Sequence, residues 1–161
     1  MPDLKPTQIE VYLFRRRARR VEFLCLKRAG KGRLRGVWQP VTGSLRRAED
    51  PLAGAAREVR EETGLKPRCW WALEGVGIYF DPRAGRARVM AMFAAEVGAR
   101  ERVTLSREHS AFAFLRASAA GRRFLWEAQR RGLESVKREV LRGGRLAAAL
   151  EVTRLVRSSR K

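Results

Sequence analysis

Short apolar runs, separated by polar or glycine-containing connections, fill most of the chain before residue 116. Runs of this length that are rich in β-branched and aromatic residues are typical of strands. Residues 89–95 are apolar without interruption, as in a central strand covered on both faces, which favours a layered α/β fold. The pattern predicts strands at 8–14, 21–26, 37–41, 69–80, 88–97 and 111–115.

One segment between these strands carries clear helix signals. Asp50 can cap free N–H groups, Pro51 fits the first helical position and Gly64 supplies a stop, so a helix is predicted over 51–63. Apolar residues recur within it at helical spacing and predict one face packed on a core: Leu52, Ala55, Ala56 and Val59.

The chain after residue 115 has the spacing of helices. Ser118 is expected to open a helix, and Gly132 is expected to end it before a further stretch over 133–141. The residues expected to face the core in the first of these helices are Phe124, Leu125 and Ala128.

A glycine pair, Gly143 and Gly144, precedes a last predicted helix over 146–156. We expect a helical part at 118–156, a frayed basic tail at 157–161, and a single domain formed by all 161 residues.

Composition excludes several classes of protein. With 45% hydrophobic and 33% charged residues, the chain is too apolar for a wholly disordered protein and too interrupted by charge for a membrane span. Cys25 and Cys69 lack paired ligand spacing, and the N-terminus lacks the pattern of a secretory signal. We therefore expect a soluble cytoplasmic protein with no membrane partner.

The charge is strongly positive, with 36 basic and 17 acidic residues and a net charge of +19. Because the planar fork of arginine binds two phosphate oxygens at once, nucleotide or nucleic-acid ligands are physically sensible. A compositional bias toward arginine explains the same charge without any ligand, so both interpretations stay open.

Three glutamates gather on one side of the predicted helix. Glu58, Glu61 and Glu62 stand at i, i+3 and i+4, so their carboxylates converge. Like charges held together cost stability unless a cation screens them. Mg²⁺ suits this arrangement because it prefers oxygen ligands and takes only one or two carboxylates beside water and phosphate.

The spacing around these glutamates resembles the Nudix box. Gly43 is followed after five residues by Glu49 and after seven more by Arg57-Glu58, and the pattern ends at Gly64 and aliphatic Leu65. The resemblance over 43–65 implies a Nudix-type α/β/α sandwich with a mixed sheet. It also implies a hydrolase of phosphoric anhydride bonds that uses Mg²⁺, with Mn²⁺ as an alternative.

The family pattern assigns roles to box residues by position. Glu61 is either a metal ligand or the base that orients water, and Glu49 and Arg57 resemble the buried pair that stiffens the box. The metal ligands implied by the resemblance are the Gly43 carbonyl, Glu58, Glu61 and Glu62.

The resemblance continues outside the box. Thr42-Gly43, where many relatives carry Gly-Gly, and the stretch 107–115 are similar to the branch that includes dihydroneopterin triphosphate and dATP pyrophosphohydrolases. Within that stretch Glu108 matches a family acid that binds metal or acts as a base. The single histidine, His109, is expected to support the loop.

Substrate contacts are expected from residues near the box. The basic rim favours a highly charged ligand, and the candidates are Trp38, Arg35, Arg46 and Arg47. The leading function is hydrolysis of a nucleoside triphosphate or a related nucleoside-diphosphate-linked substrate. The alternatives are an RNA 5′-pyrophosphohydrolase and a catalytically idle module that binds nucleic acid. The sequence leaves monomer and homodimer open.

Overall fold

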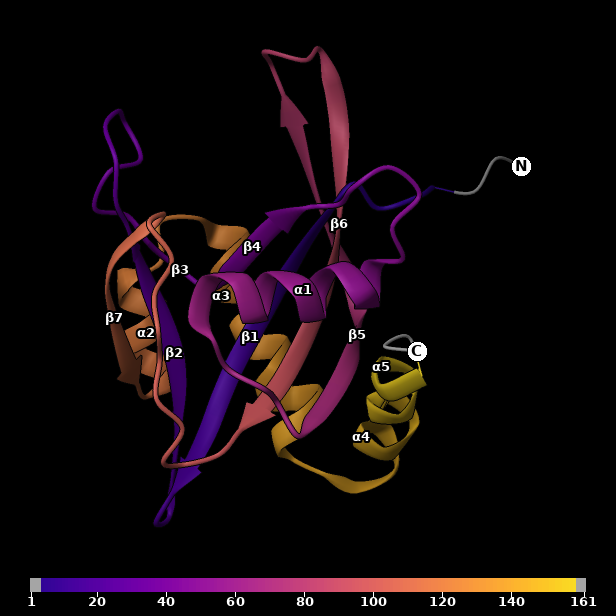
Figure 1. Cartoon of the computed structure of the whole chain (residues 1–161). Helices are drawn as coiled ribbons and strands as arrows, with labels where there is room; N and C mark the ends of the chain where they lie inside the picture. Colours follow the sequence, from indigo (N-terminus) through magenta and orange to yellow (C-terminus); the bar gives the residue numbers. More distant parts are fainter. Residues whose placement is uncertain (1–3, 159–161) are drawn as a thin grey trace.

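A computed structural model describes residues 4–158, and a mixed β-sheet forms its centre (Figure 1). The described residues contribute seven strands in the order β3-β2-β1-β6-β5, with β4 paired to β1 and β7 paired to β2. Only β1 and β6 run parallel, while the other neighbours are antiparallel. The strands are β1 (Gln8–Arg17), β2 (Arg20–Arg28), β3 (Trp38–Gln39), β4 (Val41–Ser44), β5 (Cys69–Asp81), β6 (Arg86–Val97) and β7 (His109–Leu115).

Helices cover both faces of the sheet, which confirms the predicted α/β class with a mixed sheet. In Figure 1, α1 crosses in front of the strands and α3 lies behind them. The helical segments are α1 (Pro51–Thr63), α2 (Ala117–Arg123), α3 (Glu127–Val136), the π-helical turn η1 (Lys137–Leu141), α4 (Gly144–Leu150) and α5 (Thr153–Ser158).

Strand β1 divides the core in two. Ile9, Val11 and Leu13 pack in the cluster that includes α1, whereas Tyr12 and Phe14 pack in the cluster that includes α2 and α3. Because successive strand residues point to opposite faces, one buried strand supplies both cores. This double burial explains why the strand reads as a nearly continuous apolar run.

The predicted strands are present, with two differences. The segment expected at 37–41 is divided at Pro40 into β3 and β4, because proline has no N–H for a ladder. The run 89–95 is fully buried only toward its end, since the β5–β6 hairpin extends beyond the helices (Figure 1).

The prediction that Gly132 ends a helix is wrong. Helix α3 continues through Gly132, where a Cβ atom would stand 2.1 Å from the Tyr12 hydroxyl oxygen. The glycine permits close contact between α3 and β1, which sequence spacing does not reveal.

Two predicted core residues also lie elsewhere. Leu125 and Ala128 are exposed, and only Phe124 of the three is buried. The cause is the break between α2 and α3, which falls between residues 123 and 127 and changes which residues face the sheet.

The single helix predicted over 146–156 is instead two helices, α4 and α5. Between them Glu151 forms a bridge with Trp71, and the N–H of Val152 donates to the Trp70 carbonyl oxygen at 2.8 Å. The Thr153 hydroxyl accepts a 2.9 Å hydrogen bond from the Trp70 N–H. Pairing with the outer side of β5 therefore replaces helical hydrogen bonds here.

The basic tail expected at 157–161 is described only in part. Arg157 and Ser158 end α5, and residues 159–161 lie outside the described part of the chain. No helix within residues 4–158 has both the length and the apolar character needed to cross a bilayer.

Candidate active site

Helix α1 presents the candidate acidic residues, and its ends are those predicted. The Asp50 carboxylate accepts hydrogen bonds of 3.0 Å from the N–H groups of Leu52 and Ala53. Gly64 closes the helix with a φ of 69°, a left-handed conformation that glycine adopts at little cost. These local signals determine where the glutamates of α1 stand.

The three glutamates differ in burial. Glu62 is only 4% exposed, Glu58 is half-buried and Glu61 is exposed. Ala55 and Val59 hold the adjoining side of the helix in the core. The carboxylates thus extend from the edge of the core into solvent.

Gly43 in β4 allows the Glu58 carboxyl to lie against the sheet. A Cβ atom at residue 43 would stand 2.3 Å from Cδ of Glu58, closer than real Cβ contacts come. Gly43 pairs with Ile9 of β1, so its position is set by the sheet. The box therefore needs glycine here to bring a carboxylate beside the backbone.

Arg57 connects the acidic residues of the box. Its Nε and Nη2 atoms donate to the Glu49 carboxylate at 2.7 and 2.8 Å, and this fork lowers the pKa of Glu49 to about 2. The Nη1 atom donates to Glu58 at 2.7 Å and to Glu61 at 3.0 Å. The Ser44 carbonyl oxygen accepts a further bond of 3.2 Å. Arg57 therefore fixes α1 to the preceding loop.

Glu62 is the least satisfied of these acids. Its Oε2 atom is buried without a hydrogen-bond partner in the described residues. Burial raises the pKa of Glu62 to about 8, and repulsion from Glu58 and Glu108 adds to the shift. Burial also raises the pKa of Glu58, although its ion pair with Arg57 opposes the shift. A cation would stabilise both carboxylates.

Glu108 reaches this cluster from a distant part of the sequence. The N–H of Ser106 donates to the Glu62 carbonyl oxygen at 3.1 Å, and the N–H of Ala29 donates to the Glu108 carbonyl oxygen at 2.8 Å. These bonds hold the loop before β7 beside the end of α1. The structure thus brings together Glu58, Glu61, Glu62 and Glu108.

His109 follows this acid but is buried, with 6% of its surface exposed. Neither ring nitrogen has a hydrogen-bond partner among residues 4–158, and burial lowers the pKa of the ring. It pairs with Arg28 where the register between β2 and β7 shifts.

The donor set fits a hard divalent cation. It offers carboxylate oxygens, one of them buried and unpartnered, beside the backbone of Gly43. In residues 4–158 no three acidic, histidine or cysteine side chains already form a metal-holding group. Mg²⁺ suits such a site, because it keeps several waters rather than requiring an all-protein cage.

The candidate arginines surround the box in different ways. Arg46 donates to Glu61 at 3.2 Å, and its backbone N–H donates to Glu49 at 2.9 Å. Arg47 is exposed, as is Arg35 in the loop between β2 and β3.

Trp38 is partly buried, and two cations face its ring. The Arg123 guanidinium carbon lies 4.6 Å from the ring centroid and the Lys27 Nζ atom lies 5.9 Å from it. Trp38 also forms a bridge with Phe124. The Trp38 ring is therefore already in contact with two basic side chains, which leaves less of it free to stack on a nucleotide base.

Two residues of interest were missed by sequence reasoning. A Cβ atom at Gly54 would stand 2.3 Å from Cδ2 of Leu45 and 3.1 Å from Oε2 of Glu49, so this glycine lets the box loop close on α1. The only signal was a glycine inside a helix, which needs a packing reason. Trp126 is 51% exposed next to the bridge at Phe124, and nothing in its local sequence marks it.

Comparison with known sequences identifies the family. The family model described as NUDIX domain matches residues 6–136, well over half of the chain. The chain belongs to the Nudix family. It is a Nudix-type hydrolase, of the class that acts on phosphoric anhydride bonds. No curated protein is significantly similar to the sequence.

Solved structures share the Nudix fold with this chain. The C. elegans Ap4A hydrolase in a binary complex has a TM-score of 0.70 and 20% identity, covering 81% of this chain and 94% of its own. The E. coli dihydroneopterin triphosphate pyrophosphohydrolase has a TM-score of 0.65 and 22% identity, covering 81% and 93%. A MutT protein from Methanosarcina mazei has a TM-score of 0.61 and 26% identity, covering 84% and 96%.

Proposed function

We propose that this Nudix hydrolase cleaves a nucleoside triphosphate, or a related compound linked through a nucleoside diphosphate, in a Mg²⁺-dependent reaction, with Mn²⁺ as an alternative metal. The observation that carries the proposal is the glutamate cluster of α1, in which the buried Oε2 atom of Glu62 has no partner among the described residues. Repulsion within the cluster is offset when a divalent cation binds.

The Gly43 carbonyl with Glu58, Glu61 and Glu62 would hold the metal. When bound, Mg²⁺ neutralises charge that develops on phosphate oxygens and lowers the pKa of a coordinated water. The backbone at Gly43 and the buried Glu62 are rigidly placed by β4 and α1, so the site is largely organised before substrate arrives.

The base in this proposal is Glu108. Its carboxylate has no hydrogen bond or ion pair within residues 4–158, whereas Glu61 is bonded to Arg57 and Arg46. Glu108 accepts a proton from the attacking water as the water oxygen bonds to phosphorus. The bond from phosphorus to the leaving phosphate oxygen breaks, and the leaving group departs with the electron pair.

Glu49 and Arg57 act as positioning residues. The ion pair between them is 11% and 14% exposed at its two side chains, so solvent screens it little. Through Arg57 it orients Glu58 and Glu61 without touching the reacting atoms.

The substrate assignment rests on charge. Arg46 and Arg47 lie exposed in the loop between β4 and α1, and Arg35 lies exposed in the loop before β3, so several cations are available to a polyphosphate. The C. elegans and E. coli neighbours carry the names of enzymes for Ap4A and dihydroneopterin triphosphate, which supports this substrate class. Cys25 and Cys69 are free thiols, in keeping with action in the reducing cytoplasm.

A substrate screen tests the proposal. Purified protein with Mg²⁺ is assayed against nucleoside triphosphates, dinucleoside polyphosphates and triphosphorylated RNA, and the products are identified. Release of pyrophosphate and a nucleoside monophosphate from a triphosphate is expected. Turnover of RNA ends alone would promote the RNA alternative, and no turnover of any of them would contradict the proposal.

A further inference from the structure

The π-helical turn η1 lies on the opposite side of the sheet from the Nudix box. Helix α3 and η1 pack with Tyr12 and Phe14, whereas α1 packs with Ile9 and Val11. The turn begins at Lys137, just after the family match ends at residue 136. It is therefore a feature of this chain beyond the matched domain.

The π turn places a buried carboxylate against β5. Glu139 is 2% exposed, and its Oε2 atom accepts a 3.0 Å hydrogen bond from the N–H of Glu74. Glu74 lies where the register between β5 and β6 shifts, so its N–H has lost a strand partner. Within the π turn Glu139 faces inward and satisfies this N–H.

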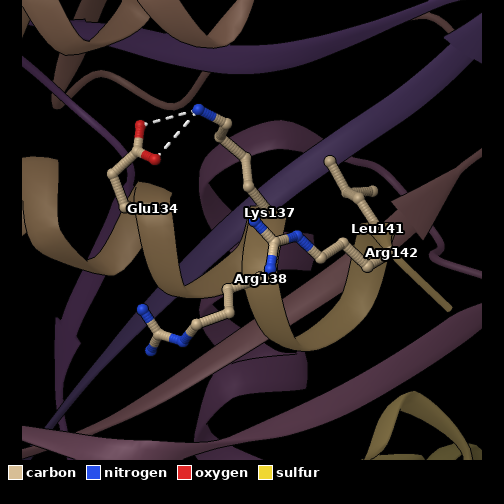
Figure 2. A pocket seen from close by; sticks show the side chains of 5 residues that line it. All are labelled: Glu134, Lys137, Arg138, Leu141 and Arg142. Atoms are coloured by element: carbon tan, nitrogen blue, oxygen red, sulfur yellow. Dashed lines mark hydrogen bonds and ion pairs between the residues drawn. The ribbon is translucent and has the colours of Figure 1, made fainter. Parts of the chain in front are cut away.

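The π turn also brings cations together on the outer surface. The N–H of Arg142 donates to the Lys137 carbonyl oxygen at 3.3 Å, a link between residues five apart that is characteristic of a π turn. Residues 137 and 142 thereby become neighbours along the helix surface. In Figure 2 the guanidinium group of Arg142 extends back along the helix toward Lys137 and Arg138.

These side chains line a hollow of about 420 Å³. Sites for small ligands commonly have volumes of about 300–1,000 Å³. The hollow is lined by Glu134, Lys137, Arg138, Leu141 and Arg142 (Figure 2).

The three basic side chains of the hollow differ in the hydrogen bonds and ion pairs that they already form. Lys137 donates to Glu134 at 2.9 Å, and Nη2 of Arg138 donates to the inward-facing Glu139 at 2.7 Å. Nη2 of Arg138 also donates to the Ser135 hydroxyl at 3.1 Å, and these contacts hold Arg138 in place while its Nε and Nη1 donors stay available. No hydrogen bond or ion pair occupies the Arg142 side chain within residues 4–158.

We propose that this hollow is a second anion site, which binds a short chain of phosphoryl groups through Arg142, Arg138 and Lys137. Guanidinium forks bind phosphate oxygens in pairs, and Lys137 adds a point charge. An anion would offset the repulsion that the π turn imposes. The ligand is a small polyphosphate anion, whether inorganic or carried by a nucleotide.

Binding of inorganic tripolyphosphate, measured by calorimetry in EDTA, tests the site. Without divalent metal the carboxylates of the box repel anions, so binding at the box is weakened and the difference between wild type and variant reports on the hollow. We expect Arg142→Gln to weaken binding at least about tenfold, as for loss of a charge-assisted hydrogen bond. The matched control is Arg154→Gln on α5, which makes the same change in net charge at an exposed residue outside the hollow.

Equal affinity of Arg142→Gln and wild type would overturn the proposal, as would equal weakening by the control. Tighter binding of a ten-nucleotide single strand than of tripolyphosphate would also overturn it, because the surface would then serve nucleic acid. Hydrolysis with Mg²⁺ should be unchanged in Arg142→Gln. Since the binding assay needs no turnover, its result is independent of the function proposed for the box.

Discussion

Helix α1 and the π turn η1 both hold like charges together, but by different geometry. In α1 an ordinary helix places Glu58, Glu61 and Glu62 at i, i+3 and i+4. In η1 a widened turn brings Lys137 beside Arg142, five residues away. The proximity of the α1 glutamates follows from sequence spacing alone. The proximity of Lys137 and Arg142 instead accompanies the irregularity in β5 at Glu74, whose N–H is bound by Glu139 of the π turn.

The two clusters also differ in how their repulsion is relieved. Arg57 supplies α1 with an internal cation, yet the Oε2 atom of Glu62 stays buried and unpartnered in the described chain. In η1 the cations reach solvent, with Arg138 56% exposed, so water screens them. A buried cluster should therefore bind its counter-ion more strongly than an exposed one.

The largest expected effect concerns the two less exposed acids of α1. Glu58→Gln and Glu62→Gln should each lower kcat at least about a hundredfold, because a neutral amide is a poor ligand for Mg²⁺. Steady-state hydrolysis of a nucleoside triphosphate measures this, with Glu127→Gln on the exposed side of α3 as a control that should retain activity. Near wild-type turnover with Mg²⁺ as the only metal would remove these residues from the site.

Glu108 lies at the exposed end of the acidic cluster, so its loss should cost less. We expect Glu108→Gln to lower kcat by about tenfold to a thousandfold, the range for removal of a positioned base. An unchanged rate would return Glu108 to the role of a turn residue.

The free energy of unfolding should depend more on the buried Glu49–Arg57 ion pair than on the exposed Glu127–Arg131 pair of similar length. Glu49→Gln breaks a pair that is 14% and 11% exposed and should lower the free energy of unfolding by about 1–3 kcal/mol. Glu127→Gln breaks a 2.6 Å pair that is 65% and 77% exposed and should change it by less than about 1 kcal/mol. Urea unfolding compares the two, and equal losses would contradict the assigned role of burial.

The pH dependence of Glu49 follows from the same pair. The pKa of Glu49 in the folded protein is about 2, below the ordinary value of 4.5. The ion pair therefore contributes fully to the free energy of unfolding above pH 4.5, and this contribution is lost as the pH falls toward 2. Glu49→Gln should therefore show a flatter fall in stability across this window, measured by thermal denaturation in acid.

The smallest effect expected is in the metal-free protein. The raised pKa of Glu62, about 8 against 4.5, means that its contribution to stability is lost as the pH rises through this range. In EDTA, Glu62→Gln should therefore raise Tm at pH 8 by about 2–4 °C for each kcal/mol of repulsion relieved. The difference should vanish below pH 4.5, and a lower Tm for the variant at pH 8 would count against the crowding argument.

Local interactions explain what could be read from the sequence. The cap at Asp50, the stop at Gly64 and the convergence of the α1 glutamates involve residues within four positions of one another, so spacing alone predicts them. The nearly continuous run of β-branched and aromatic residues along β1 likewise predicts a strand. The Nudix resemblance added the pairing of Glu49 with Arg57, and that ion pair is present.

Contacts between distant segments decided the rest. Gly132 serves close packing against Tyr12 inside α3, and α4 and α5 separate because residues 151–153 pair with Trp70 and Trp71. The position of Glu108 beside Glu62 depends on backbone hydrogen bonds from a loop more than forty residues away. Such contacts have no local spacing, because two segments must first pack on the same sheet before their polar groups can meet.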